Sequence, residues 1–303
     1  MFIIKHKALF VSISAALVVL SVVTLLVFGL KIGIDFKGGA LLEVTYTVSR
    51  PSQTDIENSI LPLNLGSALV QPTGEKGYII KTRDLSDTEH TALLSALSEK
   101  GKMPLSETNY NSIGPSVGRQ LAGKAIMAII LVSLTIVFFI AFAFRKVSKP
   151  VSSWKYGLIA IVTLLHDVMI PVGLFVLFSK FYGVEVDTLF VVAILTILGL
   201  SVSDTIVIFD RIRENLRHDK SAENSFSQTV GKSLDQSFTR SLATSLSVIL
   251  ALLALFFFGP SSTKYFSLVL VAGMFFGTYS SIFLASPLLV FTEERQRKKK
   301  KNV

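Results

Sequence analysis

Six apolar stretches, each long enough to cross a bilayer, constrain this chain more than any other feature of its sequence. A membrane-spanning helix needs roughly 20 apolar residues. Half of the 303 residues are hydrophobic and only 17% are charged, whereas soluble domains carry about 25% charged residues. The sequence therefore predicts an α-helical membrane protein with six transmembrane helices. The predicted spans are Ala8–Leu30, Ala125–Phe144, Tyr156–Phe178, Leu189–Phe209, Leu242–Phe258 and Tyr265–Phe291.

The first and last stretches depart from a simple spanning helix. Ala8–Leu30 is longer than the core of a typical secretory signal and ends in a poor cleavage site, so we expect an uncleaved span. Tyr265–Phe291 is unusually long and contains Gly273, Gly277 and Pro287. Because proline disrupts the hydrogen bonds of a helix, we expect this last span to be tilted or broken. The two glycines have the spacing of a close helix–helix contact.

Lysine and arginine are distributed unevenly among the connections between the spans. The N-terminus, the second and fourth connections and the C-terminal tail together hold 18 of them, whereas the short connections on the other side hold two. Since cytoplasmic loops are enriched in these residues, we expect both termini to be cytoplasmic. The basic run Arg297–Lys301 is expected to meet solvent or anionic lipid. No nucleic-acid partner is expected, and RNA contact by this run is the less favoured alternative.

The long connection 31–121 then faces outward, and its 9 basic and 10 acidic residues nearly balance. Most of the net charge of +9 therefore follows from membrane topology. The predicted divisions are residues 1–30 with the first span, the outward domain 31–121, the remaining spans within 122–291 and a basic tail 292–303.

The outward domain alternates between strand and helix patterns. Its strands are predicted at Ala40–Val48, Leu65–Gln71, Tyr78–Arg83 and Pro104–Ile113. Helices are predicted over Thr54–Leu63 and Ser86–Lys100, with Thr54 and Ser86 as N-caps and Glu57 and Glu89 three residues later. The order β-α-β-β-α-β is that of a ferredoxin-like α+β domain. This domain has no clustered metal ligands or paired carboxylates, so we expect partner binding or scaffolding, without a metal or cofactor.

Two ionisable residues in the fourth and fifth spans are candidates for function, because a charge at mid-span costs roughly 2.5–3.5 kcal/mol on insertion scales. Asp204 lies seven residues before Arg211, which places it about 10 Å from the cytoplasmic edge. Arg240 opens the fifth span, and its long side chain can reach inward. Burial favours the protonated acid and a nearby guanidinium favours the carboxylate, so an Asp between these effects can exchange a proton near neutral pH.

We therefore expect Asp204 and Arg240 to form a proton pathway, with Arg240 as the permanent counter-charge. Hydroxyl groups that can hold relay water are supplied by Ser201, Ser203, Thr205 and Thr244. The alternative is that Asp204 only joins helices through a hydrogen bond.

The third span carries a second pair of ionisable residues, His166 and Asp167. They are possible support for the proton pathway. Adjacent helical residues point about 100° apart, so we expect that they cannot face one site equally. A structural role is favoured, in which Asp167 hydrogen-bonds to a neighbouring helix.

The connection after the fourth span has two further patterns. Asp210, Arg211, Arg213 and Glu214 are expected to form interfacial salt bridges of little energy. The segment 222–239 carries apolar residues every four positions and is predicted to lie along the cytoplasmic surface as an amphipathic helix.

Five motifs occur in order along nearly the whole chain, and together they resemble the SecF family of bacterial protein-export membrane proteins, in the SecD/SecF group of the resistance-nodulation-division (RND) superfamily. The motifs are GIDFKGG (33–39), SIGPSVG (112–118), HDV (166–168), SDTIVIFDRIREN (203–215) and TRSLATS (239–245).

The resemblance implies an RND-type half-unit in the bacterial plasma (inner) membrane, paired with SecD. Such complexes are thought to use the proton-motive force to assist export of unfolded polypeptide through the SecYEG translocon after SecA has pushed it. The resemblance also implies that Asp204 and Arg240 are proton-pathway residues, with a further Asp supplied by SecD. Ser203 and Ser241 stand where many relatives have Asn and Thr.

Three alternatives remain open at the level of sequence. An RND-type exporter half-unit for small molecules or lipids shares the predicted fold. A translocon scaffold without proton coupling fits the same topology. An intramembrane aspartyl protease is disfavoured because Asp204 lies in SVSDT and not in a GxGD pattern. We expect no covalent catalytic site, and therefore a transport subunit that is not an enzyme.

Overall fold

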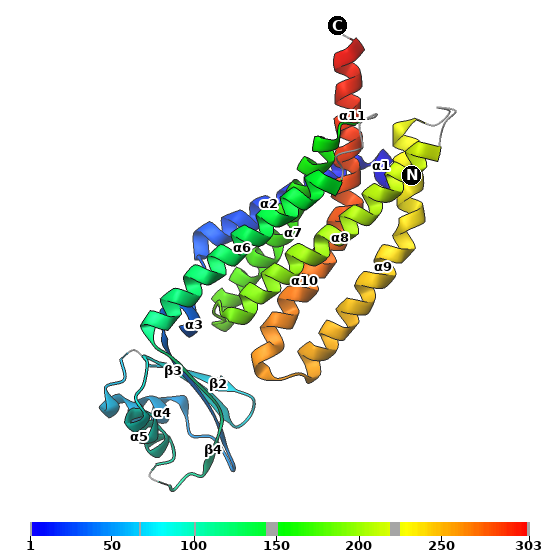
Figure 1. Cartoon of the computed structure of the whole chain (residues 1–303). Helices are drawn as coiled ribbons and strands as arrows, with labels where there is room; N and C mark the ends of the chain where they lie inside the picture. Colours follow the sequence, from blue (N-terminus) through cyan, green and yellow to red (C-terminus); the bar gives the residue numbers. More distant parts are fainter. Residues whose placement is uncertain (1, 67, 100, 144–150, 219–224, 302–303) are drawn as a thin grey trace. The chain divides into compact units, whose positions relative to one another are not determined.

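The computed structural model describes residues 2–66, 68–99, 101–143, 151–218 and 225–301. The chain forms two compact units, one comprising Ile32–Ile126 and the other Met1–Lys31 together with Met127–Val303. Figure 1 shows that the first is a small α+β unit and the second is α-helical. Part of the predicted basic second connection (145–149) and the start of the predicted amphipathic segment (222–224) lie outside the described residues.

The α+β unit contains a four-stranded antiparallel sheet of order β2-β3-β1-β4. Its chain order β-α-β-β-α-β and its sheet order confirm the predicted ferredoxin-like fold. The strands are β1 (Gly39–Tyr46), β2 (Leu69–Thr73), β3 (Gly77–Thr82) and β4 (Leu105–Ile113), and the helices are α3 (Ile34–Lys37), α4 (Gln53–Ile60), the short 3₁₀ helix η1 (Leu61–Leu63) and α5 (Asp87–Leu97).

The core of this unit follows from alternation along β1. Residues 40, 42, 44 and 46 of β1 are buried, and they pack with apolar residues of α4 and α5. Tyr46 is the largest side chain of β1, and its hydroxyl donates a hydrogen bond to the carbonyl of Leu97 at 3.0 Å. Burial raises the pKa of Tyr46 to about 12. Tyr46 therefore ties the sheet to the end of α5 as a neutral donor.

Helices α4 and α5 each begin with a capping box, and the box of α5 is the one predicted correctly. At α5 the Ser86 hydroxyl accepts a hydrogen bond from the Glu89 N–H, and the Glu89 carboxylate accepts one from the Ser86 N–H, as expected. The predicted cap Thr54 is wrong, because α4 begins at Gln53 with Ser52 as its cap. Asp55, three residues after Ser52, completes the reciprocal pair that fixes the earlier start.

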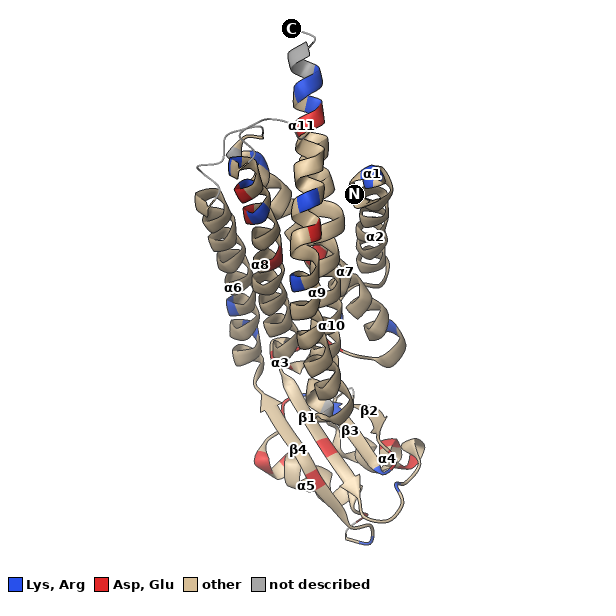
Figure 2. Cartoon of the chain, turned by 90° about the vertical axis from the view of Figure 1, so that its right-hand side faces the viewer, with Lys and Arg blue, Asp and Glu red and all other residues tan. Residues whose placement is uncertain are grey.

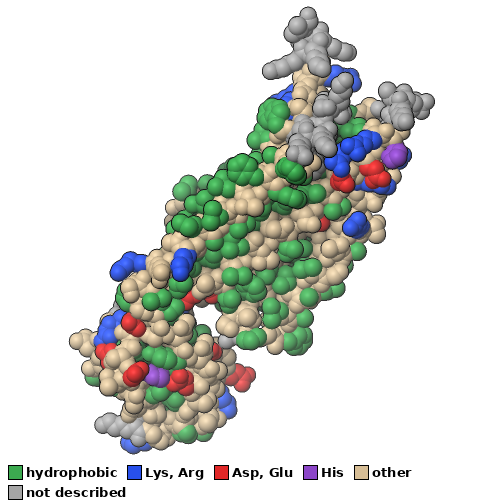
Figure 3. Space-filling view, in the orientation of Figure 1, with side chains coloured by type: hydrophobic (Ala, Val, Ile, Leu, Met, Phe, Trp, Pro, Cys, Tyr) green, Lys and Arg blue, Asp and Glu red, His purple; other side chains and the backbone are tan. Residues whose placement is uncertain are grey.

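The α-helical unit contains six helical segments long and apolar enough to cross a membrane, which confirms the six predicted spans. Figure 3 shows hydrophobic side chains along the visible face of these helices. In Figure 2 the charged residues of the unit are few along the middle of the helices and gather toward their ends. The helices are α1 (Phe2–Lys5), α2 (Lys7–Phe28), α6 (Pro115–Ala143, which starts in the α+β unit), α7 (Ser153–Tyr182), α8 (Thr188–His218), α9 (Phe226–Phe258), η2 (Ser261–Thr263), α10 (Lys264–Ser280), η3 (Ser281–Ala285) and α11 (Ser286–Lys301).

Three spans form the interior of this unit. In the most apolar 18-residue stretch of α7, α8 and α10–α11, 56%, 44% and 61% of the residues are buried, against 17%, 6% and 11% in the corresponding stretches of α2, α6 and α9. The close contact predicted for Gly273 and Gly277 is present. A Cβ on Gly273 would lie 2.3 Å from Ile197, and one on Gly277 would lie 3.3 Å from Ser201. The two glycines therefore let α10 approach α8 closely.

The predicted amphipathic surface segment is wrong, because its described part belongs to one continuous helix, α9, that also forms the fifth span. Ser225 caps this helix with Gln228, and no proline separates the first turns from the span. The apolar residues Phe226, Val230 and Leu234 are buried within the chain. Their spacing of four therefore marks an intramolecular contact, because it fits a packed helix as well as a surface-bound one.

The last span is interrupted, as expected from its length and its proline. It changes from α-helix to the π-helix η3 at Ser281 and returns to α-helix at Ser286. Pro287 has no N–H for the carbonyl of Phe283, which explains why the regular pattern cannot continue through this turn. Single-turn π-helices occur frequently at functional sites.

Candidate functional site

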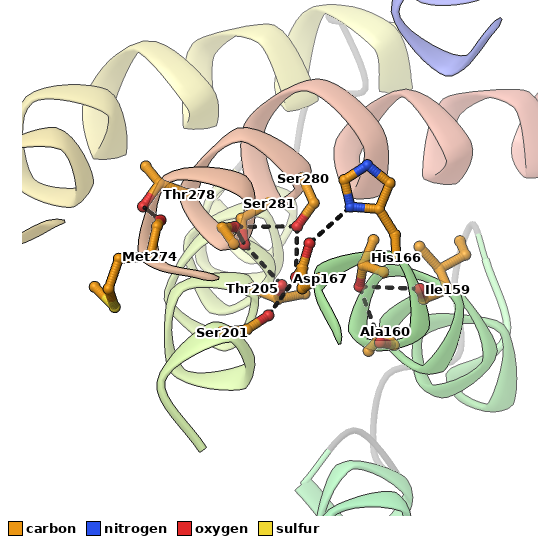
Figure 4. A network of polar contacts seen from close by, with 12 residues as sticks. Ile159, Ala160, His166, Asp167, Ser201, Thr205, Met274, Thr278, Ser280 and Ser281 are labelled. Carbon is orange, nitrogen blue, oxygen red and sulfur yellow. Dashed lines mark hydrogen bonds and ion pairs between the residues drawn. The ribbon is translucent and has the colours of Figure 1, made fainter. Parts of the chain in front are cut away.

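A polar network lies where α7, α8, α10 and η3 meet, and Figure 4 shows the part of it around Asp167. A second carboxylate, Asp204, joins the network through hydroxyls of α9 and α10. Asp167 comes from α7 and Asp204 from α8. Asp167 is fully buried, whereas Asp204 is partly exposed on the surface of the single chain. The rest of the network consists mainly of serine and threonine hydroxyls.

Asp167 has three polar partners from three elements. The Ser280 hydroxyl donates to Oδ2 of Asp167 at 2.7 Å, and the Ser201 hydroxyl donates to the same oxygen. Nδ1 of His166 lies 2.8 Å from Oδ1. The predicted hydrogen bond from Asp167 to a neighbouring helix is therefore present, on both α8 and α10.

His166 and Asp167 are not expected to face one site equally, yet their side chains contact each other. Their Cα–Cβ bonds diverge as expected for adjacent helical residues. The imidazole ring, however, extends far enough from the helix for Nδ1 to turn back to the neighbouring carboxylate. Both side chains consequently belong to one buried cluster.

Asp204 has hydroxyl partners from two other helices. Thr278 of α10 donates to Oδ2 of Asp204 at 3.2 Å, and Ser245 of α9 donates more weakly at 3.4 Å. The Ser245 and Thr278 hydroxyls are themselves 2.5 Å apart. Among the described residues, no lysine or arginine forms an ion pair with Asp204. Hydroxyls can accept as well as donate, so these partners can serve either the acid or the carboxylate form of Asp204.

Arg240 does not meet Asp204 within this chain. It lies on α9 and is exposed, and its position explains the separation. Ser245, which faces Asp204, comes five residues later, so the two residues point about 140° apart around α9. The role predicted for Arg240 stays a prediction, and the structure leaves its guanidinium on the outer face of the helix.

The four hydroxyls predicted to support the pathway fall into two groups. Ser201 and Thr205 join the network, Ser201 through Asp167 and Thr205 through a 2.8 Å bond to Ser281. Ser203 and Thr244 are exposed. Thr244 donates only to the carbonyl of Arg240 in its own helix.

Sequence reasoning missed four hydroxyl residues that the structure places in the network, namely Ser245, Thr278, Ser280 and Ser281. Three of them lie close together in the last span, next to the π-helix. That clustering was the available signal, but it is weak. A serine in a span can satisfy itself on its own helix, as Ser245 also does through the carbonyl of Ser241.

No group of three or more His, Cys, Asp or Glu residues that would suit a metal ion occurs in the described part of the chain. The arrangement offers instead two carboxylates in an apolar setting, a histidine and a row of hydroxyls. Such groups can bind and release protons without any further atom.

Comparison with known proteins matches residues 93–295 to the family model "Protein export membrane protein SecD/SecF, C-terminal". The chain is 41% identical to the protein translocase subunit SecF of Thermobaculum terrenum, covering 97% of this chain and 94% of that protein. It is 32% identical to the SecF subunit of Anaerolinea thermophila, with 96% and 94% covered.

The fold matches that of the crystal structure of SecDF, a translocon-associated membrane protein from Thermus thermophilus. The TM-score is 0.81 at 27% identity, and the match covers 95% of this chain and 38% of the longer SecDF chain. The sequence and fold matches cover almost the full length of the chain, and the family model covers residues 93–295. This chain belongs to the SecF branch of the SecD/SecF family of protein-export membrane proteins.

Proposed function

We propose that this chain works in protein export at the bacterial inner membrane, as the SecF-type half of a proton-driven complex with SecD. In this proposal the complex uses the proton-motive force to assist unfolded polypeptide through SecYEG after SecA has acted. Membership of the family supports a role in Sec-pathway translocation. No covalent catalytic step is part of the proposal.

A separate SecD partner is supported by the longer relatives. The chain aligns with 38% of the SecDF subunit of Bacillus subtilis and 33% of that of Brucella abortus. In those proteins a SecF-like part and further sequence share one polypeptide. These fused relatives support association of this chain with SecD.

The observation that carries the proton role is the environment of Asp204. It lies in a membrane-spanning helix with only hydroxyl partners, from Thr278 and Ser245. A permanently ionised carboxylate without a counter-charge is costly in such a place, whereas one that gains and loses a proton is suited to it.

Arg240 is proposed to act from the other side, as the fixed cation that meets a carboxylate of SecD. It is exposed on α9, and in the most apolar 18-residue stretch of that helix only 11% of the residues are buried within this chain. A guanidinium left facing lipid would be expensive, so a protein partner at this face is the favourable alternative.

The test uses a preprotein export assay in vesicles that contain SecYEG, SecA, SecD and this chain, with and without an imposed proton gradient. Without a gradient, the Asp204→Asn and Arg240→Ala variants are expected to export preprotein at the wild-type rate. An imposed gradient should accelerate export by the wild type and leave the export rate of both variants unchanged. The matched control is Asp210→Asn on the same helix, whose exposed carboxylate pairs with Arg213 at 2.6 Å. It should keep the full stimulation.

If the proton gradient stimulated export by the Asp204→Asn variant as strongly as export by the wild type, Asp204 would have no role in proton coupling. If the Arg240→Ala variant also exported normally while the family assignment stood, the chain would instead be a scaffold for the translocon without proton coupling.

A further inference from the structure

One nitrogen of the buried His166 ring has no partner. Nδ1 is engaged with Asp167 at 2.8 Å, but Nε2 is buried and lacks a hydrogen bond within the described residues. The side chain is only 2% exposed. An unpartnered polar atom in a protein interior is uncommon and usually has a functional or solvent-related reason.

We propose that His166 and Asp167 form a second proton-binding site in the membrane, separate from Asp204, in which the proton binds at Nε2 of His166. In the unloaded state the imidazole is neutral, its Nδ1–H donates to Asp167, and the pair carries one negative charge. Loading takes one proton from water onto Nε2, which makes the ring an imidazolium and the pair neutral. Unloading returns that proton to water. The inference rests on the proposed proton-coupled function and adds a second site to it.

The contacts of Asp167 favour a carboxylate that stays ionised in both states. The hydroxyls of Ser201 and Ser280 both donate to Oδ2 of Asp167, and Nδ1 of His166, at 2.8 Å from Oδ1, donates there in the Nδ1–H tautomer of this proposal. Hydrogen bonds to a carboxylate stabilise its charged form. The proton that moves is therefore assigned to the histidine.

The surroundings of the ring suit a cation that is present part of the time. Asp167 supplies the counter-charge directly beside it. The ring of Tyr279 stacks on His166 with centroids 6.2 Å apart and planes inclined by 17°, and Phe276 meets it edge-on at 6.4 Å. Aromatic rings at about 6 Å favour a cation over bulk hydrocarbon.

Few other titratable groups face this site from the elements packed against α7. From α8 the nearest charged group is Asp204, since the next ones begin at Asp210. From α10 the titratable neighbour is Tyr279, and η3 contains none. α2 has a single charged residue, Lys7, which is paired with Glu294 of α11.

Helices α8 and α10 each contribute residues to both sites, which couples them. On α8, Ser201 contacts Asp167 and lies one turn before Asp204. On α10, Thr278 contacts Asp204 and Ser280 contacts Asp167. A negative charge at one site therefore favours retention of the proton at the other, and the two sites are expected to release protons in turn.

The test is ¹⁵N NMR of the full chain in lipid nanodiscs, labelled at its four histidines. His166→Gln assigns the His166 signals by their loss. We expect Nε2 to change from unprotonated to protonated as the pH falls between about pH 8 and about pH 5, while Nδ1 stays protonated throughout. In the Asp167→Asn variant the imidazolium should be absent above about pH 5, because its counter-charge is gone.

A matched control is Thr163→Val, which removes a buried hydroxyl on the same helix that bonds only to the carbonyls of Ile159 and Ala160. It should leave the titration unchanged. The proposal is overturned if Nε2 of the wild type keeps one protonation state over the whole range, a result that needs no variant to fold. The NMR readout is independent of export. The proposal of a second proton site can therefore be refuted while the proposed export function stands, and the export function can be refuted while the second site stands.

Discussion

Both intramembrane carboxylates receive hydrogen bonds from serine and threonine hydroxyls of neighbouring helices. Among the described residues, no charged side chain from another helix pairs with either of them. A salt bridge would fix Asp204 in its ionised form. Hydroxyls such as those of Ser245 and Thr278 can rotate to donate to a carboxylate or accept from an acid. The site thus keeps hydrogen bonds in both protonation states, as a residue that cycles between them requires.

Outside the membrane, Glu89 gives a residue-scale prediction with a defined pH dependence. Its hydrogen bond from Arg83, followed by those from Ser86, lowers its pKa from 4.5 to about 2. A carboxyl whose pKa falls on folding stabilises the folded state above pH 4.5, and that contribution is lost as the pH falls toward 2. Glu89→Gln should therefore reduce amide-exchange protection of α5 at neutral pH and flatten its decline on acidification.

Hydrogen exchange corrected for intrinsic rates, measured on the full chain, checks this expectation. Asp87→Asn is the control, since it neutralises another carboxylate in the first turn of α5 that takes no part in the capping box. Equal pH profiles for the wild type and Glu89→Gln would contradict the assignment.

At the scale of elements, the contact between α8 and α10 depends on Gly273. A methyl group there would overlap Ile197 and push the helices apart, at a cost of about 1–3 kcal/mol for an overpacked interface. Gly273→Ala should lower the stability of the purified protein in thermal unfolding. Gly199→Ala on α8 should not, because nothing lies within 4 Å of the added Cβ. An equal loss of thermal stability in both variants would mean that the close approach of α8 and α10 at Gly273 is not what the substitution disturbs.

Hydropathy and capping patterns were enough to predict the spans and the ferredoxin-like unit, because burial and local hydrogen bonds decide those elements. They were not enough for the fourth connection, since the spacing of Phe226, Val230 and Leu234 is the same in a surface helix and in a packed one. The site was found in part. Charge singled out Asp204 and Asp167, but Ser245 and Thr278 become recognisable only when helices distant in sequence are brought together.

At the scale of the whole molecule, the sequence predicts cytoplasmic termini and an outward α+β unit. The chain contains no cysteine, so single cysteines report orientation without background. Asp87→Cys, in the α+β unit, should react in intact cells with a membrane-impermeant maleimide, whereas Lys5→Cys should react only after the cells are opened. The opposite pattern would reverse the topology and place the α+β unit inside the cell.

Proton entry into vesicles that contain this chain and SecD, followed by a pH-sensitive dye inside them, measures whether Asp204 carries protons. With an imposed gradient, the wild type and Asp210→Asn should acidify the interior at equal rates, and Asp204→Asn should do so no faster than empty vesicles. Proton entry at the wild-type rate through Asp204→Asn would contradict the account.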